Sequence, residues 1–160
     1  MVTFFTALHV VAAIILLGPV VVSTSMFPKH AVEARTGSEE ATGRASVLHK
    51  VTNTYGMLSV LVPLLGGLVM ATDWGAYKTN YFLHTAIILS VIAWGLLFFM
   101  VIPQQRAIMG SLGALSPADG DASDAASNFE KAKAKAAAGA GIFNLLWLLT
   151  FILMFLPSPA

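Results

Sequence analysis

The sequence predicts an all-α membrane protein in which four transmembrane helices form an up-down bundle. Hydrophobic residues make up 57% of the 160 residues and charged residues only 11%, whereas a soluble domain carries roughly 25% charged residues. The charged residues fall in blocks, and four long apolar runs lie between them. These runs lack the alternation typical of barrel strands, so each is expected to form a helix whose backbone polar groups are satisfied internally.

The composition also excludes several classes of protein. The chain has 9 Lys and Arg residues against 8 Asp and Glu residues, and no Cys. Such a balance offers no broad basic surface, so no nucleic-acid partner is expected. The hydrophobic content is too high for a disordered chain. Without Cys there is no disulfide framework, thiolate metal site or covalently attached c-type haem.

The four expected spans each reach the ~20 residues that cross ~30 Å of hydrocarbon as a helix. They divide a single domain, residues 1–160, into spans at about 2–27, 51–71, 81–102 and 136–156. The first run has no basic residue ahead of it and no A-x-A site after it, so it is interpreted as a retained helix and not a signal peptide. Pro19 and Pro63 are expected to kink their helices, and Pro103 is expected to end the third span.

The distribution of Lys and Arg predicts the orientation of the bundle. Eight basic residues lie in the two segments 28–50 and 103–135, namely Lys29, Arg35, Arg44, Lys50, Arg106, Lys131, Lys133 and Lys135. The connection between the second and third spans contains only Lys78. Because cytoplasmic loops carry the excess of basic residues, the two segments are expected to face the cytoplasm and both termini the outside.

Two of the helices are expected to extend into the cytoplasm. Ser38, followed by two glutamates, is typical of an N-cap with first-turn carboxylates, so the second helix would begin well before its apolar run. Ser123 or Asp124 is the expected cap of a helix that passes through Ala/Lys repeats into the fourth span.

Two ionisable side chains lie inside the apolar runs, where such residues are functional candidates. His9 lies about two turns from the outer end of the first helix, and His84 about one turn from the outer end of the third. These helices are diagonal partners in an up-down bundle. Inward-facing imidazoles could therefore share a metal or act as the two axial ligands of a b-type haem. Tyr77 and Lys78 would then lie near the haem propionates.

A simpler interpretation applies to all four histidines, because a His near a helix end can hydrogen-bond to a neighbouring helix or to interfacial water. This interpretation is favoured for His30 and His49, which are expected at the cytoplasmic interface. Pro28 is expected to break the helical register between His9 and His30.

Small residues predict close approach between helices. Gly56, Ser59, Pro63 and Gly67 share one stripe of the second span. Gly139 and Gly141 play the same part in the fourth span, where small side chains let neighbouring backbones approach.

Several segments carry a family resemblance. They are Ala7-Leu8-His9-Val10-Val11-Ala12-Ala13 with Leu17-Gly18-Pro19-Val20, Val47-Leu48-His49-Lys50-Val51 with Tyr55-Gly56, Ile102-Pro103-Gln104-Gln105-Arg106, and Phe143-Asn144-Leu145-Leu146-Trp147 through Leu153-Met154 and Pro157. Together they resemble a large uncharacterised family of four-helix integral membrane proteins common in actinobacteria. The resemblance implies a multi-pass protein of the bacterial cytoplasmic membrane.

More distantly, the first-helix His and the Phe82-Leu83-His84 start of the third helix resemble CopD-type membrane proteins and the haem-containing membrane protoporphyrinogen oxidase. In that oxidase the His matching His9 is a haem ligand. A functionally important Lys in its last helix has no counterpart here, since the fourth span carries no charge after Lys135. The resemblance therefore implies haem binding without the oxidase activity.

Two functions are expected from the sequence. The first is a non-catalytic accessory or assembly subunit of a larger membrane complex, for instance a respiratory one, with other membrane subunits as partners and self-association open. The alternative is a protein that binds a b-type haem through His9 and His84 for electron transfer or haem handling.

Overall fold

The computed structural model describes residues 1–115 and 128–156, and these residues form helices and turns without a strand. The helices are α1 (Val2–Arg35), α2 (Glu39–Leu58), α3 (Leu61–Thr72), α4 (Trp74–Tyr77), α5 (Tyr81–Leu96), the π-helical turn η1 (Leu97–Val101), α6 (Ile102–Ser111) and α7 (Phe129–Phe155). They combine into four stretches long and apolar enough to cross a membrane, which are Val2–Arg35, Glu39–Thr72, Tyr81–Ser111 and Phe129–Phe155. The four predicted helical spans are thus confirmed.

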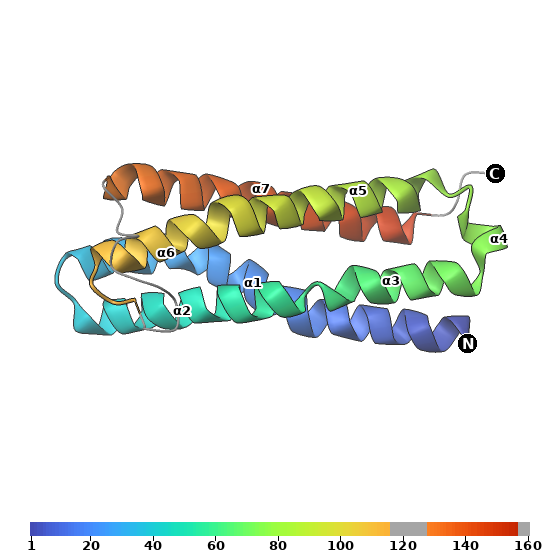
Figure 1. Cartoon of the computed structure of the whole chain (residues 1–160), viewed down its shortest axis with the longest axis horizontal. Helices are drawn as coiled ribbons and strands as arrows, with labels where there is room; N and C mark the ends of the chain where they lie inside the picture. The colour runs from blue at the N-terminus through green and yellow to red at the C-terminus, as the bar shows by residue number, and fades with distance from the viewer. Residues whose placement is uncertain (116–127, 157–160) are drawn as a thin grey trace.

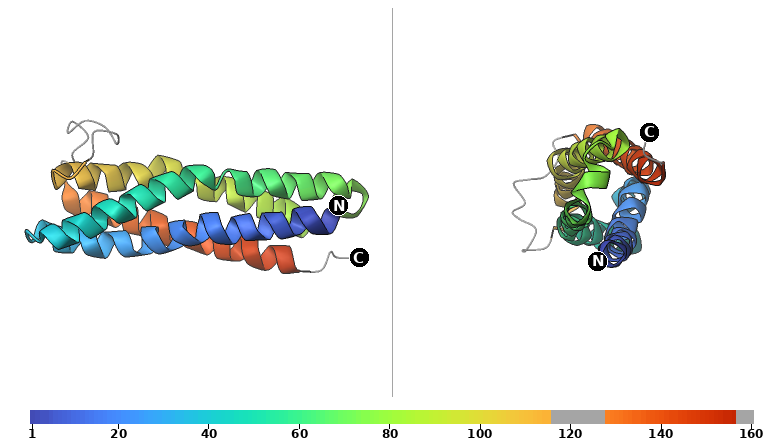
Figure 2. Two further views of the ribbon diagram at one scale, coloured as in Figure 1. Left: turned by 90° about the horizontal axis from the view of Figure 1, so that it is seen from below. Right: turned by 90° about the vertical axis from the view of Figure 1, so that its right-hand side faces the viewer.

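The four stretches lie side by side and alternate in direction (Figures 1 and 2). The start of α1, the end of α7 and the connection containing α4 lie together, and we call this end the terminal end. The opposite end, where α1 turns into α2, is called the loop end. Helix α1 packs along α2 and then α3, while α5, η1 and α6 pack along α7. Contacts between α1 and α7 and between α2 and α6 join the two pairs.

At the loop end the first two helices are joined by a tight turn. Gly37 adopts a φ of 93°, which glycine tolerates because it has no Cβ. The Ser38 hydroxyl then accepts a hydrogen bond from the Ala41 N–H at 3.2 Å. The predicted Ser38 N-cap is therefore confirmed. Most of segment 28–50, expected as a loop, is helical.

Pro28 does not break α1, and that expectation was wrong. The helix continues through Pro19 and Pro28 to Arg35. A proline inside a helix removes one backbone hydrogen bond. In membrane proteins, neighbouring helices stabilise a helix that contains a proline. Here the nearby residues Phe27 and Ala31 are fully buried in a core cluster.

Pro63, which was predicted to kink its helix, interrupts it. Helix α2 ends at Leu58 and α3 begins at Leu61. Because Pro63 has no N–H to donate four residues back, the Ser59 carbonyl accepts instead from the Val62 N–H at 3.0 Å. The break therefore falls one turn before the proline.

Pro103 does not end the third stretch, contrary to expectation. Instead the helix widens into η1, where the Ile102 N–H bonds to the Leu97 carbonyl five residues back. A π-type turn accommodates the missing donor of a proline without breaking the helix. As a result the stretch continues through α6 to Ser111.

Helix α7 begins at an Asn cap. The Asn128 side-chain carbonyl accepts from the Lys131 N–H at 3.0 Å. The expected caps Ser123 and Asp124 lie outside the described residues. The Arg35 guanidinium bonds to Glu130 at 3.0 Å and lies 4.8 Å from the Phe129 ring centroid, which joins the end of α1 to the start of α7.

The buried core lies in the loop half and the middle of the bundle. One cluster, near the loop end, contains Phe27, Ala31, Ala45, Ile108, Met109, Ala132 and Ala136. A second, near the middle, contains Val20, Ala93, Leu97, Val101 and Phe143. In contrast, no residue of α1 before Leu17 is buried. The terminal half contains fewer buried residues than the loop half, among them Val62, Ala86 and Thr150.

Candidate functional site

His9 lies on α1 and contacts α3. Its Nδ1 is 2.8 Å from the Val62 carbonyl oxygen. A Cβ built on Gly66 would lie 3.1 Å from His9 Cε1, so the ring occupies the space that a side chain at Gly66 would fill. Since a carbonyl oxygen can only accept, Nδ1 carries the proton and Nε2 keeps its lone pair in the neutral ring.

His84 lies in the first turn of α5. Its Nδ1 is 2.7 Å from the Asn80 carbonyl oxygen, four residues back in its own chain. The Asn80 side chain caps the same helix by accepting from the Leu83 N–H at 3.2 Å. The ring is thus held by the helix start, and by the same reasoning its proton is on Nδ1.

The His9 and His84 rings have the same assigned tautomer, with the proton on Nδ1, but they make no contact with each other. Within the described part of the chain, no ring contact or hydrogen bond joins His9 to His84. Trp94 bonds to Ser59, and Leu97 lies next to Gly56. These two contacts fix the register between the antiparallel second and third stretches. Extended toward the terminal end, the same register sets Gly66 opposite Ile87, which is within about one helical turn of His84. By this register the two imidazoles would lie at similar depths in the terminal half.

Tyr77 and Lys78 lie at the terminal end, in and just after the short helix α4. Tyr77 is half-buried and Lys78 is exposed. The Asp73 carboxylate caps α4 by accepting from the Ala76 N–H at 3.3 Å. These two residues share an end of the bundle with His9 and His84, and neither has a described contact with them.

The loop-half histidines are buried in side-chain contacts. His30 Nδ1 is 2.9 Å from a Glu33 carboxylate oxygen on the same helix. His49 Nδ1 is 3.3 Å from the Gln105 side-chain oxygen, and both residues are almost fully buried. The expected hydrogen bond to a neighbouring helix is found for His49, which reaches α6, whereas His30 bonds within its own helix.

A row of polar links joins the second stretch to its neighbours. Thr52 is 2.8 Å from Ser23 of α1, measured between hydroxyl oxygens. The Trp94 indole N–H of α5 donates to the Ser59 hydroxyl at 3.1 Å. Sequence reasoning identified Ser59 only as a small residue and missed Thr52. The spacing of Thr52 and Ser59 from His49 could have identified them, because it places all three residues on one face of the helix.

The small-residue prediction holds for some glycines and fails for others. A Cβ on Gly56 would lie 3.1 Å from Leu97 Cδ2, and one on Gly139 would lie 3.0 Å from Val101 Cγ2. No described atom lies within 4 Å of a Cβ on Gly67 or Gly141. The close approach in α3 is made instead by Gly66, whose neighbour is the His9 ring.

Helix α7 carries a second polar row on the face turned into the bundle. The Asn144 amide donates to the Ser25 hydroxyl of α1 at 2.8 Å. One turn further on, Trp147 Nε1 and then Thr150 Oγ1 are buried without a hydrogen-bond partner among the described residues. Among the described residues this row therefore makes one hydrogen bond to another helix, that of Asn144.

Metal binding by protein side chains alone has no support in the described residues, where no three His, Asp or Glu side chains gather to hold an ion. A b-type haem needs only two axial side chains, because the macrocycle supplies the other ligands. The donor chemistry of His9 and His84 fits that group, because each engages Nδ1 on a backbone carbonyl and no hydrogen bond from another described residue engages Nε2.

No known protein family, curated protein or solved structure matches this chain. Its function is therefore inferred from its own residues.

Proposed function

We propose that this protein is a membrane-embedded four-helix bundle that binds a b-type haem through His9 and His84, for electron transfer or haem handling. The observation that carries the proposal is the matching contact made by the two rings. Each uses Nδ1 on a backbone carbonyl, and no hydrogen bond from another described residue engages either Nε2. Ligating histidines characteristically donate their other ring N–H to such a partner, which fixes ring orientation and raises the basicity of the ligand nitrogen.

The packing of the bundle supports the same site. The terminal half contains few buried residues, with none in α1 before Leu17. Its residues are nevertheless apolar, as the surroundings of a haem macrocycle must be. Bound haem would supply one-electron redox chemistry. The chain would supply the two axial nitrogens, an apolar setting, and Tyr77 and Lys78 at the terminal end for the propionates.

An absorbance spectrum tests the proposal. Protein purified from haem-supplied cells is expected to show a Soret band, with sharp α and β bands after reduction by dithionite. His9→Ala and His84→Ala should each abolish the low-spin spectrum, whereas His30→Ala, a His at the other end of the bundle, should retain it. A colourless wild-type protein, or a spectrum unchanged in both variants, would count against the site.

The proposed orientation places both termini outside the cytoplasm, in a bacterial cytoplasmic membrane. It rests on the eight-to-one distribution of Lys and Arg between the loop end and the terminal end. The absence of Cys makes a direct test simple. Thr79→Cys should react with an impermeant maleimide in intact cells, and Thr36→Cys only after permeabilisation. The reverse pattern would invert the orientation.

A second candidate function is an accessory or assembly subunit of a larger membrane complex. It is favoured by the apolar outer face of α7, where Phe151 and Phe155 are 60% and 71% exposed and their ring centroids are 4.8 Å apart. Isolation in mild detergent should then recover a stoichiometric partner. Alanine at both Phe positions should release it, whereas alanine at the similarly exposed Ile14 and Ile15 of α1 should not. Recovery of the chain alone would oppose this function.

A further inference from the structure

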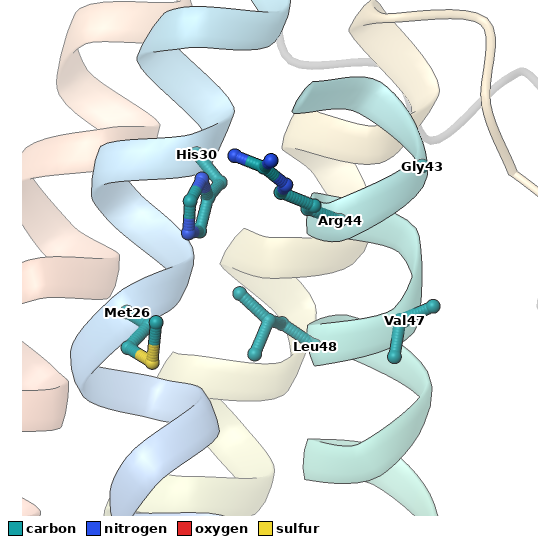
Figure 3. Close-up of a pocket in the computed structure, with 6 residues that line it drawn as sticks. All are labelled: Met26, His30, Gly43, Arg44, Val47 and Leu48. Carbon is teal, nitrogen blue, oxygen red and sulfur yellow. The ribbon is translucent and has the colours of Figure 1, made fainter. Parts of the chain in front are cut away.

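A groove opens between α1 and α2 near the loop end. Its volume is about 580 Å³, and its lining consists of Met26, His30, Gly43, Arg44, Val47 and Leu48. Figure 3 shows the Arg44 side chain reaching from α2 toward His30 of α1, with Met26 and Leu48 below them. The groove therefore has an apolar lower part and a polar rim formed by one residue from each helix.

The position of the groove along the helices matches the border of a membrane. Met26 belongs to the apolar run of α1, whereas Lys29, one turn further, is 76% exposed as a side chain and begins the charged segment. On α2 the order is reversed, since Arg44 precedes Val47 and Leu48. Along α1 the groove thus spans the border between apolar and charged residues, and on α2 its apolar wall lies between Arg44 and Lys50. This mixture is typical of the depth where lipid headgroups meet acyl chains.

Arg44 and His30 at the rim are each paired with a carboxylate of their own helix. Arg44 forms an ion pair with Glu40, and their side chains are 53% and 75% exposed. Glu33 accepts from His30 at 2.9 Å and lies 3.9 Å from Lys29. Exposed ion pairs of this kind contribute little to stability. A phosphate can therefore take the place of a carboxylate at the Arg44 guanidinium, whose fork of donors suits phosphate oxygens.

We propose that this groove binds one anionic glycerophospholipid of the surrounding bilayer. Its phosphate binds Arg44, with His30 beside it, and an acyl chain lies along Met26 and Leu48. Pockets between transmembrane helices that combine basic and apolar residues recognise anionic lipids through both parts. The site lies at the opposite end of the bundle from His9 and His84, so it is independent of haem binding.

Native mass spectrometry of the full chain in detergent tests the site, with phosphatidylglycerol and phosphatidylcholine of identical acyl chains as probes. The wild type is expected to bind phosphatidylglycerol about fivefold more tightly, which is the contribution of one basic residue. Arg44→Gln should remove this preference. Lys50→Gln, which removes the same charge from an exposed position on α2 outside the groove, should retain it.

Two further variants examine the parts of the site separately. Glu40→Gln should strengthen phosphatidylglycerol binding, because it removes the carboxylate that competes for Arg44. Met26→Trp should weaken binding of both lipids, because it fills the apolar part of the groove. Equal affinity of the wild type for the two lipids, or an equal loss in Lys50→Gln and Arg44→Gln, would overturn the proposal. Unchanged binding in Met26→Trp would overturn the placement of the acyl chain.

Discussion

Ser59 shows how a single residue can serve two purposes in this bundle. It is fully buried at the break between α2 and α3, where its hydroxyl donates to the Gly56 carbonyl at 2.6 Å and accepts from the Trp94 indole. The first bond satisfies a carbonyl near an interrupted helix end, and the second joins α5 to the break. Interhelical hydrogen bonds of this kind average about 0.6 kcal/mol in membrane proteins.

A double-mutant cycle measures that link. Trp94→Phe and Ser59→Ala should each lower the free energy of unfolding in mixed detergent micelles, with a coupling energy of about 0.6 kcal/mol between them. Trp147 supplies a matched control, because its indole nitrogen is buried without a partner in the described chain. Trp147→Phe should show no coupling to Ser59→Ala. Equal coupling for the two tryptophans would contradict the assigned bond.

Two glycines of α7 provide a second test at the residue scale. Gly141→Ala meets no described atom within 4 Å and should raise the free energy of unfolding by about 0.5–1 kcal/mol, because alanine favours a helix interior. Gly139→Ala should be destabilising by about 1–3 kcal/mol, because its Cβ would lie 3.0 Å from Val101, a stiff and fully buried side chain. Similar unfolding free energies for the two variants would refute the close approach of α7 to η1.

At the scale of elements, caps and prolines decide where the helices begin, break and continue. Caps act locally, so the Ser38 cap could be predicted from the sequence. Prolines depend on their surroundings. Pro63 breaks its helix, Pro28 lies inside the continuous helix α1, and Pro103 is accommodated by a π-type turn. A proline costs each helix the same hydrogen bond, and the neighbouring helices determine how the backbone adjusts.

The cap of α7 can be tested by hydrogen exchange. Asn128→Ala removes the acceptor of the Lys131 N–H, a change that costs roughly 1 kcal/mol of helix stability. Exchange in the first turn of α7 should therefore accelerate about fivefold, with no change in α2. Asn128→Asp, which keeps the acceptor, should exchange like the wild type. Unchanged exchange in Asn128→Ala would place the start of the helix elsewhere.

At the scale of the whole molecule, the buried core and the proposed haem site occupy different halves of the bundle. The buried clusters and most polar links lie in the loop half and the middle, whereas the candidate haem ligands lie in the terminal half, which contains fewer buried residues. A rigid half can hold the four helices in position while the other half admits a prosthetic group. Such sites are commonly built in bundle cores from side chains on facing helices.

Two phenylalanines of α7 test this division. Phe143 is fully buried in the middle cluster, whereas Phe155 is 71% exposed. Phe143→Ala should lower the free energy of unfolding by about 2 kcal/mol or more. The expected loss is smaller than the ~3–5 kcal/mol that a Phe→Ala substitution costs in a water-soluble core. The reason is that a phenyl group exposed to lipid loses little transfer free energy. Phe155→Ala should have almost no effect. A larger loss at Phe155 would place the packed core at the terminal end.

The sequence by itself determined the number of spans, their approximate positions and the candidate intramembrane residues. A long apolar run must form a helix in lipid, since no other open structure satisfies its backbone. Local chemistry likewise predicted the Ser38 cap and a distortion of the second helix at Pro63. The function and the family resemblance remain predictions.

Only the tertiary structure decided which side chains meet. It placed the His9 ring of α1 against Val62 and Gly66 of α3, joined Thr52 to Ser23 and Trp94 to Ser59, and left Gly67 and Gly141 without close neighbours among the described residues. The physical reason is that a helix with apolar side chains on every side has no polar face to mark its outer surface. Its sequence therefore does not indicate which face meets another helix and which meets lipid, and packing makes that choice.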